Sequence, residues 1–327
     1  MNQKLDKFRE ILNEWGKERK AFFFLIDFEK EAPFVCPLEE LQKHLILLKM
    51  PNFRNYTPTK QGFINDFQIF PVTYEEYKKS FDFVQQQINY GNSYLVNLTF
   101  PAYINTDYTL EQIFYAASSP YKLFFKNKFV SFSPESFIKI ADRKIYSFPM
   151  KGTIDASISD ARKIILEDEK EKREHYTIVD LIRNDLSMVA EKVQVSRFRY
   201  IQEIKTSRKH LYQVSSEIQG DLPENWQENI GNILLTLLPA GSISGAPKEK
   251  TIEIIQQAEK DKRGYYTGIF GIFDGKNLDS AVNIRFIEER NNFKIYRSGG
   301  GITSQSNPKS EYNELIDKIY VPIDGNH

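Results

Sequence analysis

The sequence is poor in the residue types that cross-link a chain or bind soft metals. Cys36 is the only cysteine in 327 residues, so intrachain disulfides and thiolate zinc clusters are excluded. Because it lies in the apolar run 33–37, we expect a packed, unreactive thiol. Of the four histidines, His44 and His327 lack metal-ligand spacing, which leaves His175 and His210 to be considered with the motifs around them.

The sequence also lacks an excess of charge and a long apolar run. Lysine plus arginine number 44, as do aspartate plus glutamate, so the net charge is zero and a nucleic-acid partner is not expected. No segment approaches the roughly 20 apolar residues that a membrane-spanning helix needs. Residues 1–6 lack the apolar run of a signal peptide. We therefore predict a cytoplasmic protein without a membrane partner.

What the chain does have is bulk for a large core and strands that follow one another directly. It is 41% hydrophobic and contains 25 phenylalanines and 18 tyrosines. Strands without helices between them favour an α+β fold, with large antiparallel sheets packed as a sandwich and helices outside. The expected strands are 21–26, 93–100, several within 121–155 and 192–219, 266–273, 279–288 and 293–298. The expected helices are 73–89, 160–190, 224–238, 247–259 and one from Pro308.

The most informative stretch is Pro149-Met150-Lys151-Gly152-Thr153, which follows a predicted hairpin turning at 141–143. If the pairing of that hairpin continues, residue 135 lies opposite residue 150. Glu135 is then diagonal to Lys151, roughly 5–8 Å away. An amine and a carboxyl at one strand end can act as nucleophile and proton donor. The same two residues can also be a surface ion pair worth at most about 1 kcal/mol.

Two predicted helices each carry a Glu-x-x-Glu pair, Glu171 with Glu174 and Glu311 with Glu314. This spacing puts both carboxylates of a pair on one helix face, where they repel each other unless a cation lies between them. Oxygen ligands suit Mg²⁺, which takes one or two carboxylates besides waters and the substrate. A solvated acidic helix face has the same pattern.

Three segments have features of anion-binding sites. Ser298-Gly299-Gly300-Gly301-Ile302 follows a strand, and glycines in a turn let backbone N–H groups converge on a carboxylate. The stretch 241–248, Gly-Ser-Ile-Ser-Gly-Ala-Pro-Lys, leads into a helix N-terminus with exposed amides. Arg285, in a predicted strand, offers a bidentate fork. Because no segment matches a Walker loop or a dinucleotide fingerprint, a carboxylate is favoured over a phosphate.

Three of these segments, together with the stretch Glu174-His-Tyr-Thr-Ile-Val-Asp-Leu-Ile-Arg-Asn-Asp185, resemble the signature of the chorismate-utilising enzymes. This family includes anthranilate, aminodeoxychorismate, isochorismate and salicylate synthases. The segments are 149–153, 174–185, 241–248 and 298–302. The likeness is strong from about residue 90 to residue 320 and thin before it. It implies an anthranilate synthase component I-like fold. Residues 1–90 would be an abbreviated N-terminal part, and residues 91–327 the chorismate-binding catalytic region.

The resemblance also implies roles for individual residues. Lys151 resembles the nucleophilic lysine of the aminodeoxychorismate synthases, where anthranilate synthases carry alanine, and Glu135 resembles their general acid. Mg²⁺ is assigned to Glu174 and Glu314, with Glu171 and Glu311 beside them. Substrate contacts are implied for Arg285, Tyr266, Gly300, Gly301, Thr153, Ser244 and Lys248. Such a reaction needs the pKa of Lys151 to be lowered and the pKa of Glu135 to be raised by their surroundings.

The leading interpretation is the chorismate-binding component of an aminodeoxychorismate synthase, which makes 4-amino-4-deoxychorismate for 4-aminobenzoate and folate synthesis. Since the chain has no Gly-x-Cys-x-Gly elbow, we expect ammonia from a separate glutamine amidotransferase subunit. The alternatives are an anthranilate synthase component I, a related chorismate enzyme, and a non-catalytic chorismate-binding subunit. His175 is either next to the metal or structural. The segment 210–214 places Tyr212, rather than His210, where many anthranilate synthases carry histidine.

Overall fold

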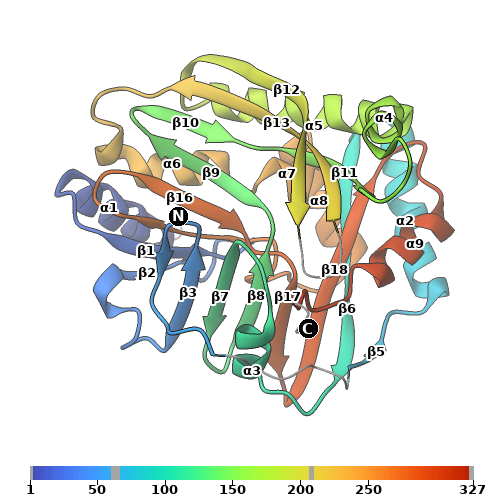
Figure 1. The fold of residues 1–327 in the computed structure, drawn as a ribbon, viewed down its shortest axis with the longest axis horizontal. Coiled ribbons are helices and arrows are strands. Elements are labelled where there is room, and N and C mark those ends of the chain that lie inside the picture. Colours follow the sequence, from blue (N-terminus) through green and yellow to red (C-terminus); the bar gives the residue numbers. More distant parts are fainter. Residues whose placement is uncertain (1–2, 60–66, 206–209, 324–327) are drawn as a thin grey trace.

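Two antiparallel sheets packed against each other form the body of the protein, with helices on their outer sides (Figure 1). The computed structural model describes residues 3–59, 67–205 and 210–323. Within these residues each sheet has nine strands. The first sheet runs in the order β11 (Met150–Asp155), β13 (His210–Asp221), β10 (Lys144–Ser147), β9 (Ser136–Ala141), β16 (Leu278–Val282), β15 (Ile269–Phe273), β1 (Phe22–Ile26) and β2 (Phe34–Pro37), with β12 (Glu191–Lys205) beside β13.

The second sheet is also built from distant parts of the chain. Its order is β14 (Gly245–Ala246), β6 (Leu95–Asn105), β18 (Phe293–Ile302), β17 (Phe286–Arg290), β8 (Phe129–Ser133), β7 (Tyr121–Phe125), β3 (Ile46–Met50) and β4 (Phe53–Arg54), with β5 (Gln68–Phe70) beside β6. Every strand pair in the described part of the chain is antiparallel. The predicted α+β sandwich is therefore confirmed.

The helices cover the outer faces of the two sheets (Figure 1). They are α1 (Gln3–Lys17), α2 (Tyr74–Asn89), α3 (Leu110–Ala116), α4 (Ala161–Glu167), α5 (Glu169–Ser187), α6 (Ile230–Leu237), α7 (Gly241–Ser244), α8 (Lys248–Glu259) and α9 (Pro308–Asp317), with short 3₁₀ turns η1 (Leu38–Glu40) and η2 (Trp226–Asn229). The start of α2 is as predicted, because the Thr73 side chain accepts a hydrogen bond from the amide of Glu76 at 3.3 Å. No helix in the described segments is long and apolar enough to cross a bilayer.

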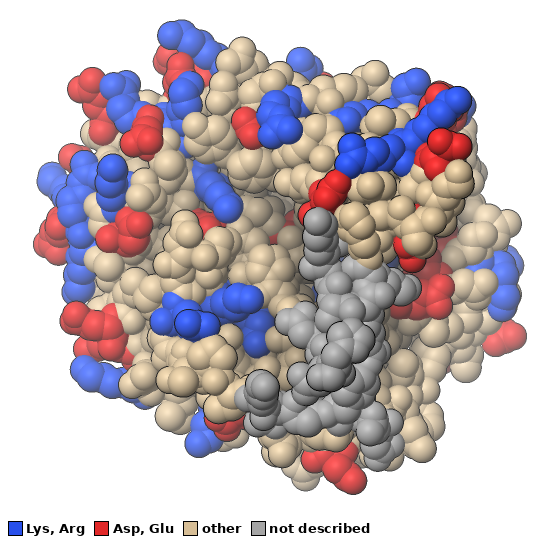
Figure 2. Space-filling view, viewed as in Figure 1, with Lys and Arg blue, Asp and Glu red and all other residues tan. Residues whose placement is uncertain are grey.

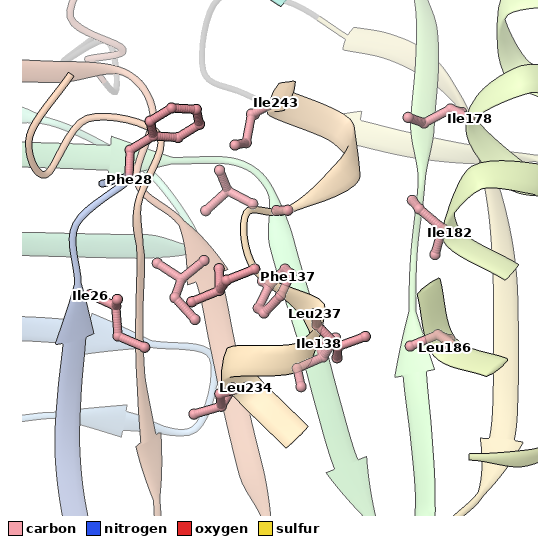
Figure 3. Close-up of a cluster of buried hydrophobic side chains, with 14 of the residues drawn as sticks. Ile26, Phe28, Phe137, Ile138, Ile178, Ile182, Leu186, Leu234, Leu237 and Ile243 are labelled. Atoms are coloured by element: carbon pink, nitrogen blue, oxygen red, sulfur yellow. The ribbon is translucent and has the colours of Figure 1, made fainter. Parts of the chain in front are cut away.

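Strand β1 shows how the core is divided. All five of its residues are buried, and alternate side chains enter different clusters. Phe22, Phe24 and Ile26 pack with the helices on the outer face, whereas Phe23 and Leu25 pack with β3, β7 and β8 of the second sheet. The outer cluster continues beneath α5, where Ile178, Ile182 and Leu186 lie along one helix face at a spacing of four (Figure 3).

Two predicted elements are wrong because the chain breaks where the sequence suggested continuity. The helix expected over 160–190 is two helices, since Asp168 ends α4 and its carboxylate caps α5 through the amide of Glu171 at 2.9 Å. The strand expected over 279–288 is also two, because residues 283–285 carry the chain from β16 in the first sheet to β17 in the second. Arg285 has a positive φ of 53° at this crossover.

The predicted hairpin forms, but its pairing does not continue. Ala141 pairs with Lys144 as expected. Met150, however, pairs with Ser215 of β13 and not with residue 135, so the route by which Lys151 and Glu135 were brought together is wrong. Residues before 90 supply β1 to the first sheet and β3 to the second. On the face shown in Figure 2, lysines and arginines are interspersed with acidic side chains.

Candidate active site

A cavity of about 430 Å³ lies where β11 and β18 meet α5, α7 and α9. It is of the size that binds small organic ligands. The structure brings all but one of the predicted site residues to its wall. They are Glu135, Lys151, Thr153, Glu171, Glu174, Ser244, Tyr266, Arg285, Gly300, Gly301, Glu311 and Glu314. The exception is Lys248.

Glu135 and Arg285 come from two neighbouring crossovers between the sheets. Glu135 lies between β8 in the second sheet and β9 in the first, and Arg285 lies between β16 and β17. The carbonyl of Glu135 accepts a hydrogen bond from the amide of Val282 at 3.1 Å, and the carbonyl of Arg285 accepts one from the amide of Phe132 at 3.0 Å. Each crossover is thus fixed by a strand that flanks the other, which anchors the main chain of both residues at the cavity wall.

The surroundings of Glu135 favour its protonated form. Burial raises the pKa of this carboxyl, although the Ser242 hydroxyl and the ammonium groups of Lys151 and Lys318 act in the opposite direction. Ser242 donates a hydrogen bond to Glu135 Oε1 at 2.5 Å. The expected upward shift of this pKa is therefore confirmed.

The surroundings of Lys151 have the opposite effect from the one predicted. Burial by itself lowers the pKa of Lys151, but the Glu174 carboxylate, with Oε2 2.7 Å from Nζ, and the charges of Glu171 and Glu314 raise it overall. In the protein alone Lys151 is therefore a charged member of an ion pair, with its side chain 31% exposed. The sequence analysis expected the surroundings to lower this pKa and did not anticipate a carboxylate in direct contact with the amine.

The four glutamates reach the cavity from two helices. Glu171 and Glu174 lie on α5, and Glu311 and Glu314 lie on α9. A Cβ atom at Gly300 would lie 3.7 Å from Glu311 Oε2 and 3.9 Å from Glu314 Oε1, so the α9 pair borders bare backbone of β18. Lys318, one turn after Glu314, bonds to its Oε1 at 2.7 Å and to the carbonyl of Gly299 at 3.0 Å.

The acidic side chains fit a hard divalent cation only in part. Among the described residues, no three Asp, Glu, His or Cys side chains are close enough to form a metal cage by themselves. Mg²⁺ needs fewer protein ligands than that, because it keeps several waters and takes oxygens from its substrate. The pairs on α5 and α9, which face one cavity, supply the right donor atoms for such an open site.

The triple glycine is not the turn that the sequence suggested. Gly299, Gly300 and Gly301 continue β18 and pair with Thr99, Leu98 and Asn97 of β6. The prediction of convergent turn amides is therefore wrong. A Cβ atom at Gly299 would lie 2.5 Å from the carbonyl of Leu98, and one at Gly301 would lie 2.9 Å from the Leu95 side chain. The glycines let β18 pass close to its neighbour while leaving its cavity side open.

Arg285, Tyr266 and Ser244, which were predicted to hold a carboxylate, differ in burial and in the contacts that they already make within the protein. Arg285 bonds through Nη1 to the carbonyl of Lys318 at 2.5 Å and lies over the ring of Tyr320. Tyr266 is buried in the cavity wall, and burial raises the pKa of its hydroxyl. Ser244 is buried and donates to the carbonyl of Ala240.

Lys248 does not reach the cavity. Its Nζ lies 2.9 Å from Asp185 Oδ2 and donates to the carbonyl of Leu237 at 2.8 Å. The structure therefore gives it contacts with α5 and the end of α6, and not a place in the cavity wall.

The sequence and the fold of this chain are similar to those of known proteins. A family model described as chorismate binding enzyme matches residues 17–324. The chain belongs to this family. An uncharacterised PabA-like protein of Haemophilus influenzae is 56% identical over 321 residues, 98% of each chain. Aminodeoxychorismate synthase component 1 of Escherichia coli is 31% identical over 264 residues, covering 76% of this chain and 57% of that protein. Anthranilate synthase component I of Streptococcus pneumoniae superposes with a TM-score of 0.67 at 25% identity, covering 78% of this chain and 59% of that one.

In this chorismate-binding enzyme neither of the two histidines under consideration lines the cavity. His175 is fully buried, shares a hydrogen bond of 2.7 Å with Ser216, and has its pKa lowered to about 4 by burial and by the charges of Arg199 and Lys151. It is a neutral group of the core. His210 is exposed, with Nε2 3.5 Å from a Glu203 carboxylate oxygen.

Lys318, Ser242 and Gln213 are among the cavity residues that the sequence analysis missed. Lys318 was detectable, since it follows Glu314 by four residues, the spacing of a helical ion pair. Ser242 lay inside a motif whose other residues were chosen. Gln213, not Tyr212, reaches the cavity from β13, where it pairs with Thr153. Only the strand register shows which residue of the 210–214 segment faces inward.

Proposed function

We propose that this chain is the chorismate-binding component of an aminodeoxychorismate synthase. The observation that carries the proposal is that Lys151 and Glu135 share the wall of one cavity, with the pKa of Glu135 raised by burial. A lysine nucleophile and a protonated carboxyl are the two groups that this reaction needs. Sequence identity does not decide between the two activities, because the chain is 31% identical to an aminodeoxychorismate synthase component 1 and 32–34% identical to several anthranilate synthase components 1.

The proposed reaction has two steps, formation of a covalent adduct on Lys151 and its displacement by ammonia. In the first, the Lys151 nitrogen bonds to C2 of chorismate, the two ring double bonds shift, and the bond from C4 to its hydroxyl oxygen breaks. Glu135 gives that oxygen its proton, and water leaves. In the second, ammonia bonds to C4, the double bonds shift back, the C2–nitrogen bond breaks, and the proton lost by the new amine returns to Glu135. Lys151 must lose its own proton before it attacks, so the reactive form is not the ion pair found in the protein alone.

The other cavity groups serve binding. Glu174 and Glu314 would hold Mg²⁺, with Glu171 and Glu311 beside them, and the ion would neutralise and orient a substrate carboxylate. Arg285, Tyr266 and the β18 backbone at Gly300 and Gly301 would receive the enolpyruvyl carboxylate. Thr153 and Ser244 would border the ring. Ammonia would come from a glutamine amidotransferase subunit, with ammonium salts as a poorer source.

Product identification tests the proposal. The protein is incubated with chorismate, MgCl₂ and an ammonium salt, and the product is identified by mass spectrometry. We expect 4-amino-4-deoxychorismate, which a lyase converts to 4-aminobenzoate. Without ammonia, peptide mapping should find chorismate minus water on Lys151. Lys151→Ala should abolish both results, whereas Lys144→Ala, which removes an ion-paired lysine from the same sheet outside the cavity, should change neither.

A second candidate is anthranilate synthase component I. It is favoured by the structural likeness to such a protein at 25% identity. This reaction does not require a lysine nucleophile at position 151. Release of anthranilate and pyruvate in the same incubation, with Lys151→Ala still active, would establish it and exclude the first proposal.

A further inference from the structure

The carboxyl of Glu135 is held by a serine from a different part of the chain. Ser242 Oγ lies 2.5 Å from Glu135 Oε1. The main chain of Glu135 is fixed as well, because its amide donates to Ser133 Oγ at 3.1 Å and its carbonyl accepts from Val282. With the backbone anchored, the remaining freedom of this residue is rotation of its side chain, which the Ser242 contact restricts.

Ser242 is itself carried on a clamped turn. It lies in α7, which packs so closely on α5 that a Cβ atom at Gly241 would lie 2.9 Å from Asp185 Oδ2 and 3.0 Å from the Leu181 side chain. Lys248 ties the two sides of this turn together, since it bonds both to Asp185 and to the carbonyl of Leu237. Ile243, next to Ser242 in the turn, and Leu237, before the turn, belong to the same buried cluster (Figure 3). The position of the Ser242 hydroxyl is therefore set by the fold.

A small second cavity lies behind the Ser242–Glu135 contact. It has a volume of about 30 Å³, enough for one water molecule. Glu135, Ser242 and Asp185 line it together with apolar side chains that include Ile182 and Leu186. A Glu135 carboxyl released from Ser242 thus has a second place to turn to, away from the substrate.

We infer that Ser242 is a positioning residue for Glu135, which keeps the acidic proton directed at the substrate and steadies the carboxylate after the proton has left. The hydroxyl donates to Oε1, so the proton of the neutral acid belongs on Oε2. When Glu135 becomes charged, the same hydrogen bond becomes a stronger, charge-assisted one. The inference rests on the proposed function only in taking Glu135 as the acid that protonates the leaving hydroxyl.

The charges around Glu135 determine the sign of the expected pH effect. Lys151 from β11 and Lys318 after α9 lower its pKa, as the Ser242 hydrogen bond does, while burial raises it. Asp185 from α5 lies across the small cavity but is paired with Lys248. Removing the Ser242 hydroxyl therefore raises the pKa of Glu135 further. Because a general acid works only while protonated, the variant keeps its residual activity to higher pH than the wild type.

The test compares Ser242→Ala, Ser242→Thr and Ser147→Ala in chorismate consumption with saturating Mg²⁺ and ammonium. Ser147→Ala is the matched control, because it removes a hydroxyl from the wall of the same small cavity. For Ser242→Ala we expect kcat to fall about 10- to 100-fold, less than the roughly 100- to 10,000-fold that a general acid contributes, because Glu135 itself remains. The KM for chorismate should stay within about threefold of the wild-type value. The ratio of its kcat to the wild-type value at the same pH should rise with pH, and taking this ratio cancels the ionisation of ammonia. Ser242→Thr should restore most of the activity, and Ser147→Ala should stay within twofold.

A double variant separates positioning from a general structural role. If Ser242 acts through Glu135, adding Ser242→Ala to Glu135→Gln should lower the residual activity no further. The inference would be overturned if the double variant lost the product of the two single-variant losses. It would also be overturned if the ratio of the Ser242→Ala kcat to the wild-type kcat did not change with pH, or if Ser242→Thr were no more active than Ser242→Ala. Product identity is read separately: a wild-type product other than 4-amino-4-deoxychorismate refutes the proposed function, while the comparison of chorismate consumption still decides the role of Ser242.

Discussion

Replacing Glu259 by glutamine should cost far more stability than any surface ion pair does, because it leaves a buried arginine without its counter-charge. Arg263 and Glu259 are 1% and 4% exposed, and the guanidinium contacts both carboxylate oxygens, at 2.8 and 2.5 Å. The same guanidinium donates to the carbonyls of Ile243 at 2.9 Å and Asn97 at 2.6 Å. Both of those residues line the cavity.

The magnitude follows from the burial. Removing one partner of a buried ion pair costs about 3–5 kcal/mol, because the remaining charge is neither paired nor hydrated. That is a large part of the roughly 5–15 kcal/mol by which folded domains are stable. The matched control is Glu31→Gln, which breaks the ion pair of the neighbouring Lys262. The side chains of Lys262 and Glu31 are 65% and 58% exposed, so the loss of stability should be small.

The measurement is urea denaturation followed by tryptophan fluorescence, with catalytic turnover measured on the same samples. We expect Glu259→Gln to lower the urea concentration at the midpoint of unfolding strongly. Turnover should fall as well, because Arg263 also holds the cavity residues Ile243 and Asn97. Glu31→Gln should leave both values near those of the wild type. Equal, small losses from the two variants would refute the reasoning, since burial would then not decide the cost of the unpaired charge.

Three further outcomes are expected. Gly245→Ala should be severely destabilising in thermal unfolding, because a Cβ atom there would clash with the carbonyl of Leu95. Gly91 also has a positive φ but lies in open space, so Gly91→Ala should lower the free energy of unfolding by only about 1 kcal/mol. Cys36 is buried and its pKa is raised to about 12, so a thiol reagent at pH 8 should label it only as the protein unfolds; rapid labelling of folded protein would contradict its packing. Chelation by EDTA should stop turnover and Mg²⁺ should restore it, and Glu314→Gln should raise the Mg²⁺ concentration needed for half-maximal rate; turnover indifferent to EDTA would exclude the proposed metal.

The sequence predicted best where the signal is local. Thr73 as the cap of α2 and the turn joining Ala141 to Lys144 depend on neighbours within a few positions, and both are confirmed. The end of α4 at Asp168 is also a local feature, but it was not predicted because charged residues typical of a helix surface continue on both sides of it. The aspartate carboxylate satisfies the α5 amides as an N-cap, and this possibility was overlooked.

The parts that the sequence could not supply depend on strand register and on crossovers. A β period of two cannot tell one long strand from two strands in different sheets, so Arg285 was placed within a strand although it lies between sheets. The triple glycine was taken as a turn because glycine permits turns, yet close approach of β6 also demands it. The ion pair of Lys151 with Glu174 joins β11 to α5, and no spacing along the chain reveals such a contact.

That ion pair has a counterpart at α9, and together they offset the charge of two of the four glutamates that line the site. Lys151 neutralises Glu174 on the α5 side, and Lys318 neutralises Glu314 on the α9 side, each with an Nζ–oxygen distance of 2.7 Å. Facing carboxylates without cations would repel each other strongly at low dielectric. The two lysines therefore make the site stable before any ion or substrate binds. A cation that binds these glutamates therefore competes with Lys151 and Lys318 for the same carboxylates.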